Sequence, residues 1–182
     1  MMIRGIVLLL AAASLPAHAE DCRSVDSSRG SVSFEVEQAG SPFQGQFRRF
    51  GGEVCLSGMR ATRVDVWLDP ASVDAGLPEI DAALKGGDFF AVERYPRVEY
   101  VSRSIAWGDQ PQIAHGVLRL KGKSRDLDVP FNLLRKVGYV VVSGVLTLNR
   151  LEYDIGTGEW SNTKWLGGEV RVKFAVALPG PS

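Results

Sequence analysis

Apolar and polar residues alternate along most of this chain. Between residues 32 and 36, valine and phenylalanine alternate with serine and glutamate, and the same period of two recurs in segments 64–68, 127–133 and 170–176. A period of two places the apolar side chains of a β-strand on one face and the polar ones on the other. Strands of this kind are typical of antiparallel sheets. Shorter segments with the same pattern are residues 98–100, 118–120 and 146–148.

Turn residues separate these predicted strands. Glycine, proline, serine and aspartate gather between them, which favours short connections and a meander of consecutive strands. The turn segments are 57–58, 69–70, 108–111, 122–124, 136–138, 156–158 and 166–168. The sequence predicts one short helix over residues 78–87. Pro78 suits a first helical turn, and Gly86 or Gly87 can end the helix.

The pattern therefore predicts an all-β fold of about eight antiparallel strands with one short helix, in a single domain of residues 20–182. Such strands can bury their apolar faces in two ways. Two sheets can stack as a sandwich, or one sheet can close into a barrel whose apolar faces point inward. An eight-stranded barrel leaves an interior that fills with side chains or holds one small ligand. The periodicity is compatible with both arrangements.

Residues 1–19 are predicted to be a cleaved signal peptide. Arg4 precedes the apolar run of residues 6–13, and Ala17-His18-Ala19 matches the small-x-small pattern of a cleavage site. The run is too short to span a bilayer, which needs roughly 20 apolar residues, so an uncleaved anchor is the less favoured interpretation. An acidic residue directly before Cys22 argues against a lipoprotein. We expect an exported protein without an integral membrane segment.

The charge of the chain excludes some classes of partner. Arg4 is the only charged residue of the predicted signal peptide, so its removal leaves 20 of the 21 basic residues against 21 acidic ones, a net charge of −1. Because there is no basic excess and no cluster of Lys and Arg, we expect no nucleic-acid binding through phosphate contacts. Attraction to a membrane surface through charge is not expected for the same reason.

Cys22 and Cys55 are the two cysteines of the chain. In an oxidising compartment they can form one disulfide, which would attach the mature N-terminus to an early strand. The alternative is two unpaired thiols, and no C-x-x-C spacing indicates a redox-active pair. One histidine and two bridged cysteines do not make a zinc site, so we expect neither a metal nor a cofactor.

The sequence offers little catalytic machinery. His115 is the only histidine outside the predicted signal peptide, and no nucleophile can be placed beside it from sequence. The motifs H-E-x-x-H and G-x-S-x-G and the P-loop are absent. We therefore do not expect an enzyme. A barrel enzyme that acts on a hydrophobic substrate through His115 is kept as a third, weaker hypothesis.

Five segments of the sequence, taken in order, resemble the YceI-like family. They are SVDSSRGSVSFEVEQAGSPFQGQFRRFGGEV, VDVWLDPASVDAG, DFFAVERYPRVEYVS, HGVLRLKGKSRDLDVPFNL and LNRLEYDIGTGEW, and the resemblance covers nearly all of the chain after the predicted signal peptide. One such segment would be weak evidence, but five in order are strong. The sequence departs from the family pattern in the first strand region, where many members carry histidines and this chain has Arg29 and Gln38.

The resemblance implies a lipocalin-like antiparallel barrel of eight strands with an apolar tunnel. Members of the family are usually periplasmic, bind polyisoprenoid lipids such as polyprenyl phosphates and isoprenoid quinones, and are often associated with alkaline or osmotic stress. The helix 78–87 and the segment 88–96 would then form a flap over one mouth of the barrel. Phe89 and Phe90 would seal the interior or touch the ligand. The alternative is that both rings only plug the barrel end as core.

The apolar alternates of the predicted strands are the candidates for lining a ligand-binding interior, although each is individually as well explained by ordinary core packing. With the two flap residues, they are Phe34, Val36, Phe47, Leu68, Phe89, Phe90, Tyr100, Leu118, Leu120, Val129, Phe131, Leu146, Leu148, Val172 and Phe174.

Arg150 and Trp160 complete the candidate ligand-binding set. Arg150 is close in sequence to Tyr153 and Trp160. It is the candidate for binding the head group of a ligand, because a guanidinium can hold a phosphate with two hydrogen bonds. The alternative is that Arg150 forms an ion pair with Glu152 or Asp154 at a strand end.

The sequence thus predicts a periplasmic protein that sequesters or carries an apolar isoprenoid, a polyprenyl lipid or an isoprenoid quinone, in its interior. The alternative function is a ligand-free barrel that acts as an interaction or stress-protection module. The expected partner is an apolar small molecule or lipid, and a homodimer is left open.

Overall fold

The computed structural model describes residues 20–108 and 111–180. The predicted signal peptide, residues 1–19, lies outside the described residues. Most of the described chain is β-strand, with one α-helix and three short 3-10 helices. The elements in chain order are β1 (Asp21–Ser24), β2 (Asp26–Gln38), β3 (Ser41–Phe47), β4 (Phe50–Ser57), β5 (Arg60–Leu68), η1 (Pro70–Ser72), β6 (Val73–Asp74), α1 (Pro78–Lys85), β7 (Val98–Ala106), β8 (Gln112–Leu120), β9 (Lys123–Lys136), β10 (Tyr139–Asn149), η2 (Arg150–Tyr153), η3 (Gly158–Ser161) and β11 (Leu166–Pro179).

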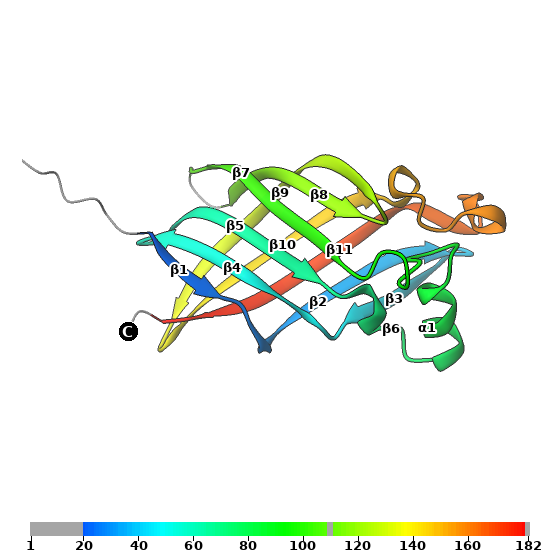
Figure 1. The fold of residues 1–182 in the computed structure, drawn as a ribbon, viewed down its shortest axis with the longest axis horizontal. Helices are drawn as coiled ribbons and strands as arrows, with labels where there is room; N and C mark the ends of the chain where they lie inside the picture. The colour runs from blue at the N-terminus through cyan, green and yellow to red at the C-terminus, as the bar shows by residue number, and fades with distance from the viewer. Residues whose placement is uncertain (1–19, 109–110, 181–182) are drawn as a thin grey trace, which may run out of the picture.

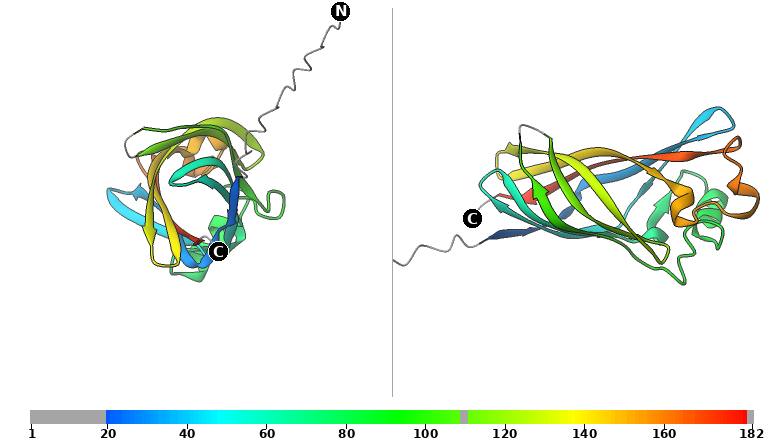
Figure 2. Two further views of the ribbon diagram at one scale, coloured as in Figure 1. Left: turned by 90° about the vertical axis from the view of Figure 1, so that its left-hand side faces the viewer. Right: turned by 90° about the horizontal axis from the view of Figure 1, so that it is seen from above.

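The strands form one antiparallel sheet of eleven strands in the order β1-β4-β5-β7-β8-β9-β10-β11-β2-β3-β6. The sheet is strongly curled into a half-barrel, and the end-on view shows its strands arranged around a common axis (Figures 1 and 2). Most neighbours in this order follow one another along the chain, as expected for a meander. The predicted antiparallel, mostly-β fold with one short helix is confirmed.

The strand that begins the sheet explains how strongly the sheet curls. Only Val25 separates β1 from β2, yet β1 pairs with β4 while β2 pairs with β11 and β3. The first strand of the order is therefore joined by a single residue to β2, which lies near the opposite end of the order. Register shifts occur in β4–β5 at Cys55/Leu56 and in β7–β8 at Ser102/Ser104. Such irregularities add twist and bend to a sheet.

The predicted number of eight strands was wrong. Strand β4 escaped the pattern because Gly51 and Gly52 interrupt the alternation, and Gly52 adopts a left-handed φ of 131° that permits its close approach to the β5 backbone. Strands β1 and β6 have four and two residues, too few for a periodic signal. The helix was predicted almost to the residue: α1 ends at Lys85 and Gly86 is its C-cap.

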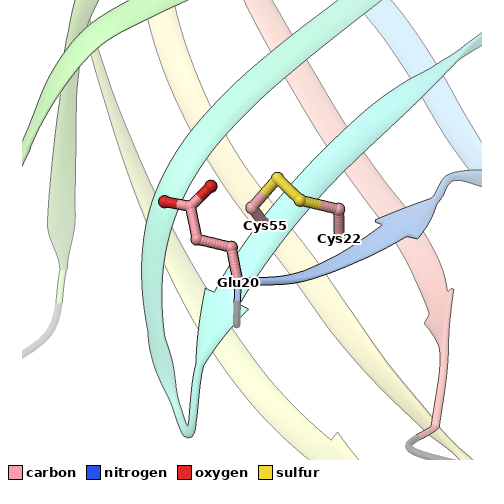
Figure 3. Close-up of side chains that lie close together, drawn as sticks. All are labelled: Glu20, Cys22 and Cys55. Carbon is pink, nitrogen blue, oxygen red and sulfur yellow. A yellow bond between two sulfur atoms is a disulfide. The ribbon is translucent and has the colours of Figure 1, made fainter. Parts of the chain in front are cut away.

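Cys22 and Cys55 are joined by a disulfide (Figure 3). They are directly opposed partners in the β1–β4 pair, so the bond fixes the first strand to the sheet. Glu20 lies close to both sulfur atoms. Since the two sulfur atoms are bonded to each other, the carboxylate of Glu20 is the only ligand that this group could supply to a cation.

In the described part of the chain no helix is long and apolar enough to cross a membrane.

Replacing both cysteines by serine (Cys22→Ser, Cys55→Ser) is expected to destabilise the protein. The disulfide closes a loop with a sequence separation of 33, which contributes about 3.7 kcal/mol in the chain-entropy description. Urea denaturation of the oxidised wild type and of the double variant measures the difference. Reductant should lower the wild-type midpoint to that of the variant and leave the variant unchanged; equal midpoints for the oxidised wild type and the variant would contradict the assignment.

Candidate functional site

The curled sheet and α1 surround an apolar cavity of about 290 Å³. Its walls are the inward faces of the strands, so side chains from nearly every part of the sheet border it. Among its lining residues only Trp67, Tyr100, Arg150 and Tyr153 carry a polar side-chain atom. A cavity with such walls offers water too few hydrogen-bond partners and holds apolar molecules instead.

The residues predicted to line the interior lie around this cavity with one exception. Those that line it are Phe34, Val36, Phe47, Leu68, Phe89, Phe90, Tyr100, Leu118, Leu120, Val129, Phe131, Leu146, Leu148, Arg150, Val172 and Phe174. Trp160 is not among the lining residues. Its ring packs on that of Phe89, with the ring centroids 5.6 Å apart, so it supports the wall from behind.

Other lining residues were missed, for two different reasons. Val32, Val64 and Leu127 belong to the same alternating faces as the predicted residues, so the alternation could have found them. Further members of this group are Val66, Val98, Val170 and Val176. Phe50 lies in the glycine-broken strand β4, and Tyr153 lies in an irregular segment, where the period of two gives no signal.

Several inward-facing side chains are only half-buried. Val129, Leu146 and Val172 line the cavity but retain accessible surface, whereas Phe131, on the same face of β9 as Val129, is 2% exposed. An inward residue is normally covered by its neighbours, because protein interiors are close-packed. The half-buried residues therefore mark where the interior is unfilled, and the surface that they expose is offered to a ligand.

Two inward glycines make room for aromatic walls of the cavity. A Cβ at Gly116 would lie 2.7 Å from the Tyr100 hydroxyl oxygen, and a Cβ at Gly144 would lie 2.6 Å from the Phe174 ring. The ends of the Tyr100 and Phe174 rings thus lie close to the backbone of the neighbouring strand. This arrangement keeps two large rings along the wall and out of the centre of the cavity.

One end of the cavity is covered by residues 78–96, which we call the flap. Leu84, Phe89 and Phe90 of the flap line the cavity, and the rings of Phe90 and Phe47 meet edge to face at 5.5 Å. The flap lies at the same end of the sheet as the segment that connects β10 to β11 (Figure 1; Figure 2, right). We call this segment, residues 150–165, the connecting segment.

Hydrogen bonds tie the flap to the connecting segment. The backbone carbonyl of Asp88 accepts from the N–H groups of Gly156 at 2.7 Å and Thr157 at 3.0 Å. Lys121, in the β8–β9 turn, donates to the carbonyl oxygens of Gly87 and Asp154, both at 2.7 Å. Partial burial lowers the pKa of Lys121, and the charges of Asp154 and Asp88 oppose that shift. A small number of polar contacts thus holds the cover of the cavity in place.

Arg150 organises the connecting segment. Its side chain is buried, at 3% exposure. Nε donates to Gly167 O at 2.7 Å, and Nη1 donates to the carbonyls of Ile155 and Gly156 at 2.7 and 2.9 Å. Nη2 donates to the carbonyls of Trp160 and Leu166, both at 2.6 Å. Burial lowers the pKa of the guanidinium.

These contacts correct the role predicted for Arg150. A guanidinium has five N–H donors, and the backbone carbonyls occupy them, so Arg150 has no donor left for a phosphate head group. The predicted alternative is also wrong: Glu152 pairs with Arg125 at 3.7 Å, and Asp154 pairs with Lys123 at 2.8 Å. Sequence proximity suggested these partners, but the carbonyl groups come from a loop whose path no local pattern reveals.

The two cavity tyrosines differ in how their hydroxyls are used. The Tyr100 hydroxyl lies 2.8 Å from Ala114 O, to which it donates, and 3.2 Å from Leu127 O. Burial raises the pKa of Tyr100. Tyr153 is 2% exposed, and burial raises its pKa, with a further increase from Glu152. Among the described residues no hydrogen bond engages the Tyr153 hydroxyl.

His115 lies away from the cavity. Its Nδ1 is 2.7 Å from a carboxylate oxygen of Asp128, and both side chains are largely exposed.

A second hollow, of about 720 Å³, lies between Arg60 and Trp107. Two of its polar side chains already have partners: Trp107 Nε1 donates to Ala61 O at 2.6 Å, and Gln112 accepts from Ala61 N and donates to Met59 O. The apolar cavity, around which nearly all of the predicted ligand-binding residues lie, is therefore the candidate site.

Comparison with known proteins identifies the family. The profile of the YceI-like domain matches residues 24–178. The chain belongs to the YceI-like family. The resemblance noted in the sequence is thereby confirmed. Among curated relatives, a UPF0312 protein of Vibrio vulnificus (strain YJ016) is 24% identical over 129 residues, which cover 69% of this chain and 68% of the relative.

Solved structures of this YceI-like chain's relatives share its fold. BcnA from Burkholderia cenocepacia is 30% identical with a TM-score of 0.80, over 84% of this chain and 98% of BcnA. A polyisoprenoid binding domain from Saccharophagus degradans, implicated in plant cell wall breakdown, is 15% identical with a TM-score of 0.68, over 87% of this chain and 98% of that domain. These relatives indicate no catalytic function.

Replacing Arg150 by lysine is expected to destabilise this YceI-like protein by about 3–5 kcal/mol, because an ammonium cannot serve the carbonyl groups of the connecting segment and leaves several of them unpaired. Arg171→Lys is the matched control, since Arg171 is exposed on β11, and it should change stability by less than about 0.5 kcal/mol. Thermal or urea unfolding measures both. Equal, small effects would show that the Arg150 contacts do not stabilise the fold.

Proposed function

We propose that this protein binds an apolar, isoprenoid-type molecule in the interior of its curled sheet and sequesters or carries it in the periplasm, after removal of the signal peptide. The sheet then works as a lipocalin-like container. The observation that carries the proposal is the cavity of about 290 Å³ with almost entirely apolar walls. The YceI-like family and the structural likeness to a polyisoprenoid binding domain support the same ligand class.

The energy of burial is sufficient for useful affinity. Each buried methylene contributes about 0.8 kcal/mol, so one isoprene unit contributes about 4 kcal/mol. Immobilising a flexible chain and losing its free motion oppose this by several kcal/mol. A ligand with three isoprene units would therefore bind with about −8 kcal/mol, which corresponds to a dissociation constant near 1 μM. No charged anchor is needed to reach that value.

The size of the cavity limits how much of a ligand it can enclose. Ligand pockets usually measure about 300–1,000 Å³, and 290 Å³ lies at the lower bound of that range. A space of this size fits a short prenyl chain. A longer polyprenyl tail would extend through the end that the flap covers, beyond Phe89 and Phe90. Ligand uptake therefore requires the flap to separate from the connecting segment.

The alternative of a ligand-free interaction or stress-protection module is favoured by one observation. Phe89 is only 8% exposed and packs on Trp160, as a plug would. The half-buried inward residues Val129, Leu146 and Val172 favour binding instead, because a module without a ligand gains nothing from leaving them uncovered.

Filling the cavity should block binding. Leu146 lines the cavity, whereas its neighbour Val145 is on the outer face of β10 and is 43% exposed. In Leu146→Trp the added ring occupies part of the space, so we expect the affinity of the delipidated protein for farnesol, an alcohol with three isoprene units, to fall at least tenfold. Val145→Trp should bind farnesol like the wild type. Fluorescence displacement titrations measure the dissociation constants.

The titration of the wild type is decisive for the proposal. Absence of saturable farnesol binding would contradict it, as would an equal loss of affinity in the two tryptophan variants. Urea denaturation of both variants controls for loss of structure, since over-packing of a core costs about 1–3 kcal/mol.

A further inference from the structure

Most of the polar groups that border the cavity are already used. The Arg150 donors are occupied by carbonyl groups, and the Tyr100 hydroxyl bonds to Ala114 O. Trp67 alternates with Val66 and Leu68 on β5, and its ring lies 4.6 Å from the Arg97 guanidinium. The Trp67 ring therefore packs toward the outer face of β5, although Trp67 also borders the cavity.

Tyr153 is the remaining polar side chain of the cavity wall. It is 2% exposed, it lines the cavity, and in the described part of the chain its hydroxyl enters no hydrogen bond. In the same part, Thr62 Oγ1 is the fully enclosed side-chain atom without a partner. The Tyr153 hydroxyl is not enclosed in that way, so it retains some accessible surface. A buried hydroxyl without a partner is unfavourable by about 1–3 kcal/mol.

The position of Tyr153 defines one end of the cavity as slightly polar. Tyr153 closes η2 in the connecting segment, at the end that the flap covers (Figure 1). The other walls are apolar, so a ligand would place its hydrocarbon body among the strands and its polar atom beside η2. Because burial raises the pKa of Tyr153, the hydroxyl stays protonated at neutral pH and can donate.

We infer that Tyr153 is a specificity-determining residue, which donates a hydrogen bond to a single neutral oxygen at one end of an apolar ligand and thereby selects prenyl alcohols, carbonyls or quinones over prenyl phosphates. This inference rests on the proposed function. No cationic side chain with a free donor borders the cavity within the described residues. A phosphate drawn inside would lose its hydration without a partner, which is strongly unfavourable, so a charged head group has to remain in water beyond the flap.

The test compares a probe that has a hydroxyl with one that lacks it. Farnesol and farnesene both have fifteen carbons in the same branched skeleton, but farnesene, which is the dehydration product of farnesol, has no hydroxyl. Affinities of both are measured for the wild type, Tyr153→Phe and the control Tyr139→Phe, whose tyrosine is at the start of β10 and does not line the cavity. In Tyr153→Phe we expect the farnesol-to-farnesene affinity ratio to fall about 3- to 10-fold relative to the wild type. Comparing ratios cancels the different solubilities of the probes.

The remaining outcomes separate this inference from the proposed function. An unchanged ratio in Tyr153→Phe, or the same fall in Tyr139→Phe, would overturn the role of Tyr153 and leave isoprenoid binding intact. If neither probe bound to the wild type, the proposed function itself would be overturned.

Farnesyl methyl ether tests the direction of the hydrogen bond without a mutation, because its oxygen can accept a hydrogen bond but cannot donate one. It should bind the wild type like farnesol, and farnesyl phosphate should bind at least tenfold more weakly. Equal binding of farnesol and farnesyl phosphate would contradict the selection of neutral ligands.

Discussion

An apolar interior that stays unfilled destabilises a protein, and the rest of this structure depends on tolerating that void. Side chains around a cavity lose the contacts that close packing would give them. At about 24 cal/mol for each Å³, a cavity of about 290 Å³ corresponds to about 7 kcal/mol, which is comparable to the whole stability of a typical domain. A fold that keeps such a space needs other sources of stability, and a ligand that fills the space restores the missing contacts.

Those other sources lie at the two ends of the curled sheet. At one end the disulfide between Cys22 and Cys55 fixes the first strand to β4. At the other end Arg150 binds carbonyl groups of the connecting segment, which in turn binds the Asp88 carbonyl of the flap. The cover over the cavity is thus positioned by a buried arginine whose donors are occupied by backbone carbonyl groups. This arrangement keeps the flap in register while leaving only a few polar contacts to be broken for opening.

The sequence predicted those features that depend on local pattern. The alternation correctly placed Leu146 and Leu148 on the inward face of β10, and the short helix followed from Pro78 and Gly86. Features that depend on distant partners escaped it. Gly51 and Gly52 concealed β4, because their role is a close approach to β5 that is visible only in the folded sheet.

Arg150 and Tyr153 show the same limit within the site. A guanidinium near acidic residues suggests an ion pair or a phosphate ligand, but the chain folds carbonyl groups around Arg150 instead. Tyr153 stands in an irregular segment where no period marks a buried face. Irregular segments are positioned by contacts far away in sequence, so the polar part of this site could not be derived from spacing alone.

The most direct measurement is the electron density of the cavity in crystals of the protein grown with saturating farnesol. We predict continuous density along the apolar walls between Val129 and Phe174, with the oxygen of farnesol beside Tyr153. An interior filled by the protein's own side chains, with no density for farnesol, would contradict the claim that this space exists to hold an apolar molecule.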